Sequence, residues 1–292
     1  MKTSYPIFLL FISLSISAQI KGVVLDSISQ KPIPYASIWI ENENIGVTSE
    51  ENGAFEINAN DKNKTLLFSA MGYEKKKVKA SNAMMVYLNP SAIQLDEIVL
   101  VKKKQTKEIE IGVTDCRTLQ AFDNGPKIDT KFFPYLPKYK KTKFIKQVAI
   151  TTDSRIDEAT VKIHFYSVDA NGFPGEEMLG RDYIVTVSRG VKKTYFNVAK
   201  FNFTMHKNGI FVGFEKLIIE KNKLEKTITE GGIVTGYLKS IYYPFILCNW
   251  VEGENFFNFS GGKWHRQTQP ENTDPKDKLK AYEPAINLIL TN

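Results

Sequence analysis

Short segments in which apolar and polar residues alternate recur along most of the chain. The segment YASIWIEN places Ala36, Ile38 and Ile40 at every second position, and VKIHFYSV repeats the pattern further on. A period of two is typical of a β-strand that buries one face. Gly, Pro and Asn residues separate these segments, and no long stretch has the 3.6-residue period of an amphipathic helix. The pattern predicts an all-β protein.

The strand-like segments form two groups. Short ones occupy residues 19–101, and longer ones, such as EATVKIHFYSVD, occupy residues 144–292. Residues 102–143 carry Lys runs and three prolines, which is typical of a basic linker between domains. The evenly spaced strands of the second group indicate a jelly-roll-like β-sandwich.

The segment GVTSEENGAFEI, residues 46–57, contains the strongest turn signal in the first group. Asn52-Gly53 stands between two strand-like runs, and both residue types tolerate a positive φ, so the pair predicts a β-hairpin. The polar tip at residues 49–52 also offers oxygen ligands for calcium. Its spacing matches no EF-hand loop, and a plain turn explains the same residues more simply.

The N-terminus has the pattern of a secretory signal peptide. Lys2 precedes the apolar run YPIFLLFISLSI, and the small residues Ser17 and Ala18 follow it. This run is too short to span a bilayer but suits a signal-peptide core. We predict cleavage near Ala18, with residues 1–18 removed, no transmembrane segment in the mature chain, and a location in the periplasm or at the cell surface.

Charge and cysteine content narrow the function classes further. The net charge of +7 is concentrated in residues 101–146, where Lys and Arg exceed Asp and Glu. Such a segment is usually solvated, or it is attracted to an anionic envelope surface, and export argues against nucleic acid as the partner. Cys116 and Cys248 are the two cysteines, and whether they are bridged stays open. No Cys or His spacing indicates a metal site or a cofactor.

Residues 20–100 resemble a known family. The matching pieces occur in order: Gly22, Val24 and Asp26, Pro32 to Ser37, Gly46 with Thr48, Asn52-Gly53 with Phe55, and Gly72-Tyr73. Together with the closing VYLNPSAIQLDEIVL, they resemble the carboxypeptidase-regulatory-like domain, which is common in exported proteins of Bacteroidetes. The resemblance implies a seven-stranded, transthyretin-like or prealbumin-like β-sandwich. Ser49 departs from the family pattern, which often has Asp there.

The resemblance implies an accessory module and no catalysis. A metallocarboxypeptidase zinc site needs an HxxE pair, whereas His164, His206 and His265 begin HFYS, HKNG and HRQT. The stretch IQLDEIVLVKKK is similar to the segment that links this domain to the plug of outer-membrane receptors, which would make it a TonB-box-like segment that adds a strand to a partner. The favoured interpretation is the last strand of the sandwich followed by a linker. The chain is too short to hold a plug and a large barrel.

The second group resembles the jelly-roll domains of exported adhesins and carbohydrate-binding modules, through KIHFYSVDANGFPGEEML, GIFVGFE and GGKWHR. Trp264, His265 and Arg266 are candidate contacts for a ligand or partner, because Trp and Arg are enriched at binding hot spots. Trp39 is another, because its alternation turns it away from Ile38 and Ile40. Core packing is the competing interpretation of both tryptophans.

No catalytic residue is assigned. A glycosidase would need two carboxylates across a cleft, and sequence spacing cannot place the available ones, which are Asp157, Glu158, Glu176, Glu177, Glu215 and Glu220. Asp169, Asn171 and Glu176 offer oxygens for calcium, but a Pro-Gly turn explains them. We predict an exported, non-enzymatic accessory protein whose partners are outer-membrane or other envelope proteins. The alternative is a carbohydrate-binding surface protein that contacts glycans, and a hydrolase ranks third.

Overall fold

The computed structural model of the chain describes residues 19–91, 106–113, 119–122, 125–230, 233–253, 256–267 and 280–292. The predicted signal segment lies outside these residues. Within them, the regular structure is β-strand apart from four short 3₁₀ turns: η1 (Ala80–Asn82), η2 (Pro137–Lys141), η3 (Ala199–Phe201) and η4 (Glu220–Asn222). The prediction of an all-β fold is confirmed. In this part of the chain, no helix has the length and apolarity needed to cross a bilayer.

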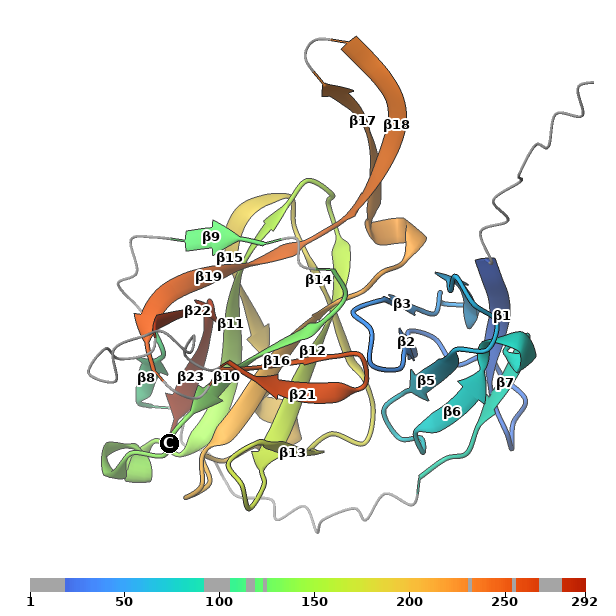
Figure 1. The fold of residues 1–292 in the computed structure, drawn as a ribbon. Coiled ribbons are helices and arrows are strands. Elements are labelled where there is room, and N and C mark those ends of the chain that lie inside the picture. Colours follow the sequence, from blue (N-terminus) through green and yellow to red (C-terminus); the bar gives the residue numbers. More distant parts are fainter. Residues whose placement is uncertain are drawn as a thin grey trace, which may run out of the picture.

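The first domain is a seven-stranded β-sandwich (Figure 1). Its strands are β1 (Gln19–Asp26), β2 (Ser37–Ile40), β3 (Gly46–Thr48), β4 (Ala54–Asn58), β5 (Thr65–Ser69), β6 (Lys76–Lys79) and β7 (Met85–Leu88). One sheet has the order β4-β1-β7 and the other β3-β2-β5-β6. Strands β1 and β7 run parallel, while their neighbours pair antiparallel. Ile38, Phe55 and Phe68 are among the apolar residues that fill the space between the sheets.

The turn around Asn52-Gly53 joins two sheets, which corrects the predicted hairpin. Strand β3 pairs with β2, whereas β4 pairs with β1. The tight reversal is present: the Gly53 N–H donates to the Glu50 carbonyl at 2.9 Å, and Gly53 has a φ of 76°. Ser49 is fully buried, and its hydroxyl accepts from the Ala36 N–H at 2.8 Å and donates to the Ile33 carbonyl at 3.0 Å. This part of the tip therefore fixes a neighbouring loop.

The second domain consists of two larger sheets and a separate ribbon. One sheet has the order β13-β12-β16-β10-β20-β21, with β14 also on β12, and the other has the order β22-β19-β11-β23-β8, with β15 on β11 and β9 on β19. The strands are β8 (Glu108–Ile111), β9 (Leu119–Ala121), β10 (Ile128–Phe133), β11 (Phe144–Ser154), β12 (Ala159–Val168), β13 (Pro174–Glu177), β14 (Tyr183–Val187), β15 (Gly190–Asn197), β16 (Ile210–Lys216), β17 (Lys223–Glu230), β18 (Ile233–Tyr242), β19 (Phe245–Glu252), β20 (Phe256–Ser260), β21 (Lys263–Arg266), β22 (Lys280–Pro284) and β23 (Ile286–Thr291).

Strands β8, β9 and β10 lie in the range that the sequence assigns to the linker. Strand β10 pairs with both β16 and β20 and is therefore a central strand of its sheet. Its sequence, IDTKFF, does not indicate a central strand, because a lysine is usually exposed. In the structure, Lys131 is buried, and its ammonium lies 2.7 Å from the Glu283 carboxylate. The second domain thus begins before residue 144, which is earlier than the sequence predicts. The prediction is wrong here because Lys131, a charged residue, is paired inside the fold.

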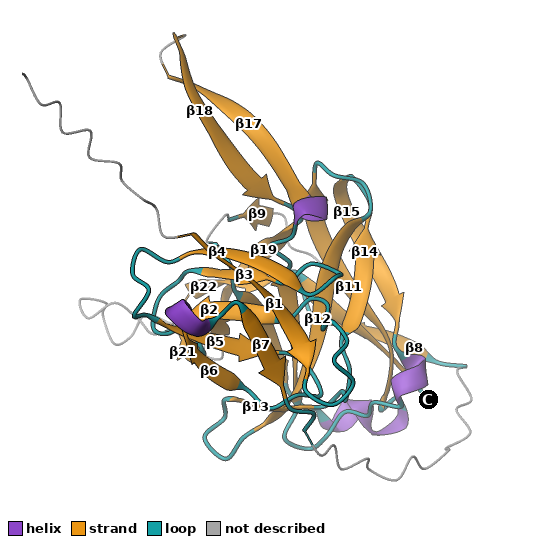
Figure 2. Ribbon diagram, turned by 90° about the vertical axis from the view of Figure 1, so that its right-hand side faces the viewer, coloured by secondary structure: helices purple, strands orange, loops and turns teal. Residues whose placement is uncertain are grey.

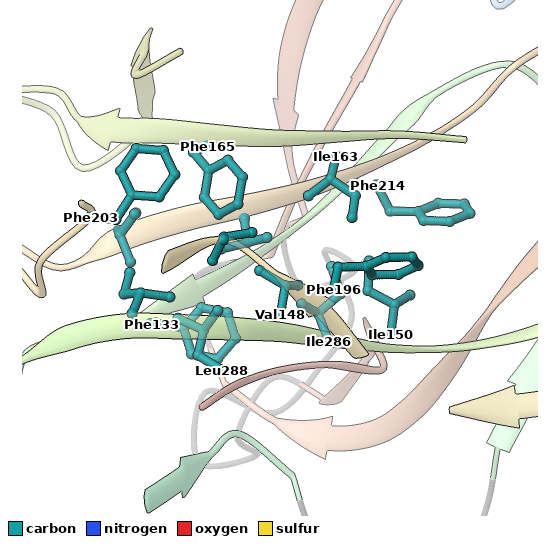
Figure 3. Packing of buried hydrophobic residues seen from close by; sticks show 14 of the residues in the cluster. Phe133, Val148, Ile150, Ile163, Phe165, Phe196, Phe203, Phe214, Ile286 and Leu288 are labelled. Carbon is teal, nitrogen blue, oxygen red and sulfur yellow. The ribbon is translucent and has the colours of Figure 1, made fainter. Parts of the chain in front are cut away.

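The main hydrophobic core fills the space between the two larger sheets (Figure 3). Ile163 and Phe165 come from β12 on one side, and Val148 and Ile150 from β11 on the other. The predicted alternation of Ile163 and Phe165 toward one face is correct. These buried branched and aromatic side chains supply most of the favourable free energy of folding in this domain.

Strands β17 and β18 form a ribbon that stands away from both sandwiches (Figures 1 and 2). Its base is fixed by Asn222, which is fully buried. The Asn222 amide donates to the carbonyls of Thr160 at 2.6 Å and Leu217 at 3.0 Å, and its oxygen accepts from the Thr160 N–H at 2.8 Å. A fully satisfied buried amide holds the root of the ribbon in one orientation.

Candidate functional site

Trp39 and Trp264 meet at the interface between the two sandwiches. Trp39 is only 2% exposed, and its ring packs edge-on against Phe259, with 6.0 Å between centroids. Leu67 and Ile128 complete this apolar cluster, and Trp264 packs against it at 5.2 Å from Phe259. The alternation correctly turns Trp39 away from the core of its own domain. The face that it reaches is covered by the second domain.

His265 and Arg266 lie beside Trp264 but have different surroundings. The His265 Nε2 atom lies 3.2 Å from the Ser260 carbonyl, within the same β20–β21 hairpin. The Arg266 guanidinium lies 5.8 Å from the centre of the Phe257 ring and lines a cleft described below. The four candidate contacts therefore divide into two interface residues, one hairpin residue and one cleft residue.

Beside the apolar cluster, the interface contains a buried network of charged side chains. His164 on β12 lies between two carboxylates, with its Nε2 atom 2.9 Å from Glu215 and its Nδ1 atom 3.1 Å from Glu177. Lys162, two residues earlier on the same face, lies 3.1 Å from Asp182 and 3.8 Å from Glu215. Glu177 and Glu215 are the candidate carboxylates that the fold brings together.

The first domain covers this network and bonds to two of its members. The Ser37 hydroxyl donates to the Glu215 carboxylate at 2.6 Å, and the Lys162 ammonium donates to the Tyr35 carbonyl at 2.8 Å. Backbone contacts extend the interface, since Ile218 N–H donates to the Thr48 hydroxyl at 3.1 Å and Asn42 N–H donates to the Gly261 carbonyl at 3.0 Å. The two sandwiches are therefore joined by polar and apolar contacts along one surface.

The network holds Lys162, His164 and Glu215 in their charged forms. Burial alone would lower the pKa of His164, but the Glu177 and Glu215 carboxylates outweigh it and raise that pKa to about 9. Burial alone would raise the pKa of Glu215, but Lys162, His164 and Ser37 lower it to about 2. For Lys162, burial is likewise outweighed by Asp182 and Glu215, and its pKa is raised. Each charge is thus stabilised by its neighbours.

Sequence reasoning misses this network because the alternation of β12 places Lys162 and His164 on a polar face, which predicts solvent exposure. Both are buried, at 2% and 6% exposure. The signal available in the sequence is the acidic pair Glu176-Glu177 shortly after the strand, although only Glu177 reaches the histidine. What cannot be read from the chain is that another domain covers this face.

A cleft of about 270 Å³ opens elsewhere, between β10 and β20 on one side and β19 and β22 on the other. It is lined by Phe122, Lys127, Asp129, Thr130, Cys248, Phe256, Phe257, Asn258, Arg266, Gln267, Tyr282 and Pro284. Lys127 and Asp129 form an ion pair at 2.8 Å. Asp129 and Asn258 are opposite each other in the pairing of β10 with β20, which places a carboxylate beside an amide.

Aromatic rings flank this cleft. Tyr282 packs against Trp250 and Phe122, with 4.5 Å between ring centroids in both pairs, and its hydroxyl donates to Gln120 at 3.0 Å. Trp250 is 47% exposed and Tyr282 is 37% exposed. The sequence does not reveal this group, because the rings come from segments that are far apart in the chain.

Metal and thiol chemistry have little support in the described residues. They contain no group of three or more His, Cys, Asp or Glu side chains arranged to hold a metal ion. The Asp169 carboxylate accepts from the N–H groups of Asn171 and Phe173, both at 2.8 Å, which is a turn-stabilising arrangement. Cys248 is a buried free thiol whose pKa is raised to about 12, chiefly by burial. Cys116 lies outside the described residues.

Comparison with known proteins agrees with the architecture of the first sandwich. A family model described as CarboxypepD_reg-like domain matches residues 20–100. A search of curated proteins found no match to the chain. The described strands β1 to β7, residues 19–88, lie almost entirely within the matched range, and this sandwich contributes Tyr35, Ser37 and Trp39 to the interface. Residues 20–100 are therefore a CarboxypepD_reg-like domain, which confirms the resemblance stated from the sequence.

Proposed function

We propose that this chain is an exported, non-enzymatic interaction protein of the cell envelope. In this proposal, the CarboxypepD_reg-like domain and the larger sandwich form one rigid body. The β17–β18 ribbon projects from that body and pairs with a strand of an outer-membrane or other envelope protein. The signal-like residues 1–18 support export, and the resemblance of the first domain to modules of exported Bacteroidetes proteins supports an envelope location.

The observation that carries the proposal is that the outer edges of the ribbon have no partner strand in the described structure. In the described structure, β17 and β18 pair with each other and with no further strand. An isolated two-stranded ribbon is only marginally stable in water, and each outer edge presents unpaired N–H and C=O groups. Strand addition to such an edge is a common mode of protein recognition. The fixed root at Asn222 presents these edges in a defined direction.

Two further observations favour a binding role over a catalytic one. The ionisable groups that converge in the structure, Lys162, His164 and Glu215, are bonded to one another and covered by the first domain. Among the described residues that line the cleft, Asp129 alone carries a carboxylate, whereas glycoside hydrolysis ordinarily uses two.

Site-specific photo-crosslinking in envelope preparations of the native host tests the proposal. Lys226 and Lys239 are exposed register partners on the ribbon and suit a photoreactive residue, and Lys21 on the central strand β1 is the matched exposed control. We expect one defined crosslinked protein from positions 226 and 239.

A shortened ribbon provides the second arm of this test. Lys223 and Tyr242 are opposite each other, so an Asn-Gly turn can replace residues 224–241 without moving the body. A crosslinker at position 223 should capture the partner in the chain with the full ribbon and should fail to capture it in the shortened variant. Equal capture of the same protein from position 21 would contradict the proposed docking.

A further inference from the structure

We infer that the cleft between β10, β20 and β22 is a binding site for an uncharged sugar ring. The cleft belongs to the second sandwich, and sugar binding there does not depend on partner docking by the ribbon. Its volume of about 270 Å³ is close to the lower limit of ligand pockets, roughly 300 Å³, which suits one small ring system. Its lining combines aromatic faces with a few polar groups, as ligand sites do.

The aromatic group provides a preorganised surface. Tyr282 is held between Trp250 and Phe122, and its hydroxyl is fixed by Gln120. Large aromatic side chains usually bury their surface, yet Trp250 and Tyr282 leave substantial ring area open to solvent beside the cleft. The flat C–H face of a sugar ring can pack on such rings, and little side-chain entropy is lost because the rings are already ordered.

The polar lining selects for a hydroxyl-rich and uncharged ligand. Lys127 supplies donors and Asp129 supplies acceptors, while the neighbouring Asn258 amide supplies both. Sugar hydroxyl groups both donate and accept, so they match this mixed set. Lys127 and Asp129 pair with each other at 2.8 Å, so these two residues present no unbalanced charge to the cleft. The remaining charged group of the lining, the Arg266 guanidinium, lies 5.8 Å from the centre of the Phe257 ring and adds further donors for sugar hydroxyl groups. This mixed set of donors and acceptors fits a hydroxyl-rich neutral sugar.

The test uses the mature chain, residues 19–292, on an array of neutral oligosaccharides, followed by calorimetric titration of the strongest hit. We expect Trp250→Ala and Asp129→Asn each to weaken binding about tenfold or more, because each removes one half of the recognition. Trp250→Phe, which keeps an aromatic face, should restore most of the affinity. Tyr195→Ala on β15 is the matched control, since Tyr195 is 49% exposed, does not line the cleft and does not belong to the group of rings formed by Phe122, Trp250 and Tyr282, and it should bind like the parent.

Either of two results would overturn the inference: no neutral oligosaccharide is bound, or Trp250→Ala and Asp129→Asn bind the hit as well as Tyr195→Ala does. Circular dichroism and the melting temperature of each variant show whether lost binding reflects lost folding. The variant with the shortened ribbon should retain full sugar binding. Failure of the sugar site and failure of the ribbon proposal are thereby distinguishable.

Discussion

Lys162 and His164 show that the surroundings of a polar residue cannot be predicted from its own strand alone. On β12 they face away from the hydrophobic core, as their alternation with Ile163 and Phe165 requires. That face is covered by the CarboxypepD_reg-like domain, so the two cations need buried partners. Glu177, Glu215 and Asp182 provide them. A buried cation is tolerated when paired and hydrogen-bonded, and removal of one partner is costly.

The raised pKa of His164 predicts a loss of stability at alkaline pH. A folded pKa of about 9, above the ordinary 6.5, means that the folded state binds the proton more tightly. This stabilisation is complete below pH 6.5 and is lost as the pH rises through 9. It amounts to a few kcal/mol, on the order of 1.4 kcal/mol per pKa unit. Denaturant unfolding at several pH values from 6 to 10 should show the decline.

Two histidine variants identify the source of that decline. His164→Gln removes the titrating group, so its free energy of unfolding should be lower at pH 6 but nearly constant between pH 6.5 and 9. His206→Gln is the control, because His206 is exposed and should leave the parent profile unchanged. An undiminished alkaline decline in His164→Gln would show that another group causes it. The lowered pKa of Glu215, about 2, also stabilises the folded state. This stabilisation is complete above about pH 4.5 and is lost as the pH falls from 4.5 through 2.

At the scale of elements, the Asn-Gly signal locates a turn correctly and misses what the turn connects. Local residues determine the reversal, because Gly53 supplies a positive φ that most residues resist. The choice between a hairpin and a crossing to the other sheet depends on which strands lie next to β3 and β4. That is a long-range property, and β2 and β1 take these places. The strands predicted from alternation fare better, because the period of two is itself local.

Gly53→Ala should destabilise the first sandwich by more than the cost of placing an alanine at a positive φ. An added Cβ would lie 2.7 Å from the Val24 carbonyl, in addition to the cost of a φ of +76°. Gly172→Ala is the matched control, because its φ is +80° and nothing lies within 4 Å of the added atom. We expect about 1–2 kcal/mol for Gly172→Ala and a further ~1–3 kcal/mol for Gly53→Ala, measured by denaturant unfolding. Equal costs would show that the turn adjusts freely.

At the scale of the whole molecule, the interface between the two sandwiches could not be predicted from the sequence. The sequence makes Trp264 a candidate ligand contact because Trp is enriched at binding hot spots, and Trp39 a candidate because its alternation turns it away from Ile38 and Ile40. They do form a binding surface, and its occupant is the other domain of the same chain. The cleft is a second long-range product, since Phe122, Trp250 and Tyr282 come from three separate segments. Neither assembly has a local pattern that could predict it.

If the interface makes the two sandwiches one cooperative body, Trp39→Ala should separate their unfolding. Truncating a buried Trp costs about 3–5 kcal/mol, and here much of that loss falls on the contact between domains. Scanning calorimetry should show one transition for the parent and two for Trp39→Ala. Trp250→Ala makes the same chemical change at an exposed site and should keep one transition. A single transition in Trp39→Ala, even at a lower temperature, would mean that the polar contacts, Ser37 with Glu215 and Lys162 with Tyr35, suffice to hold the domains together.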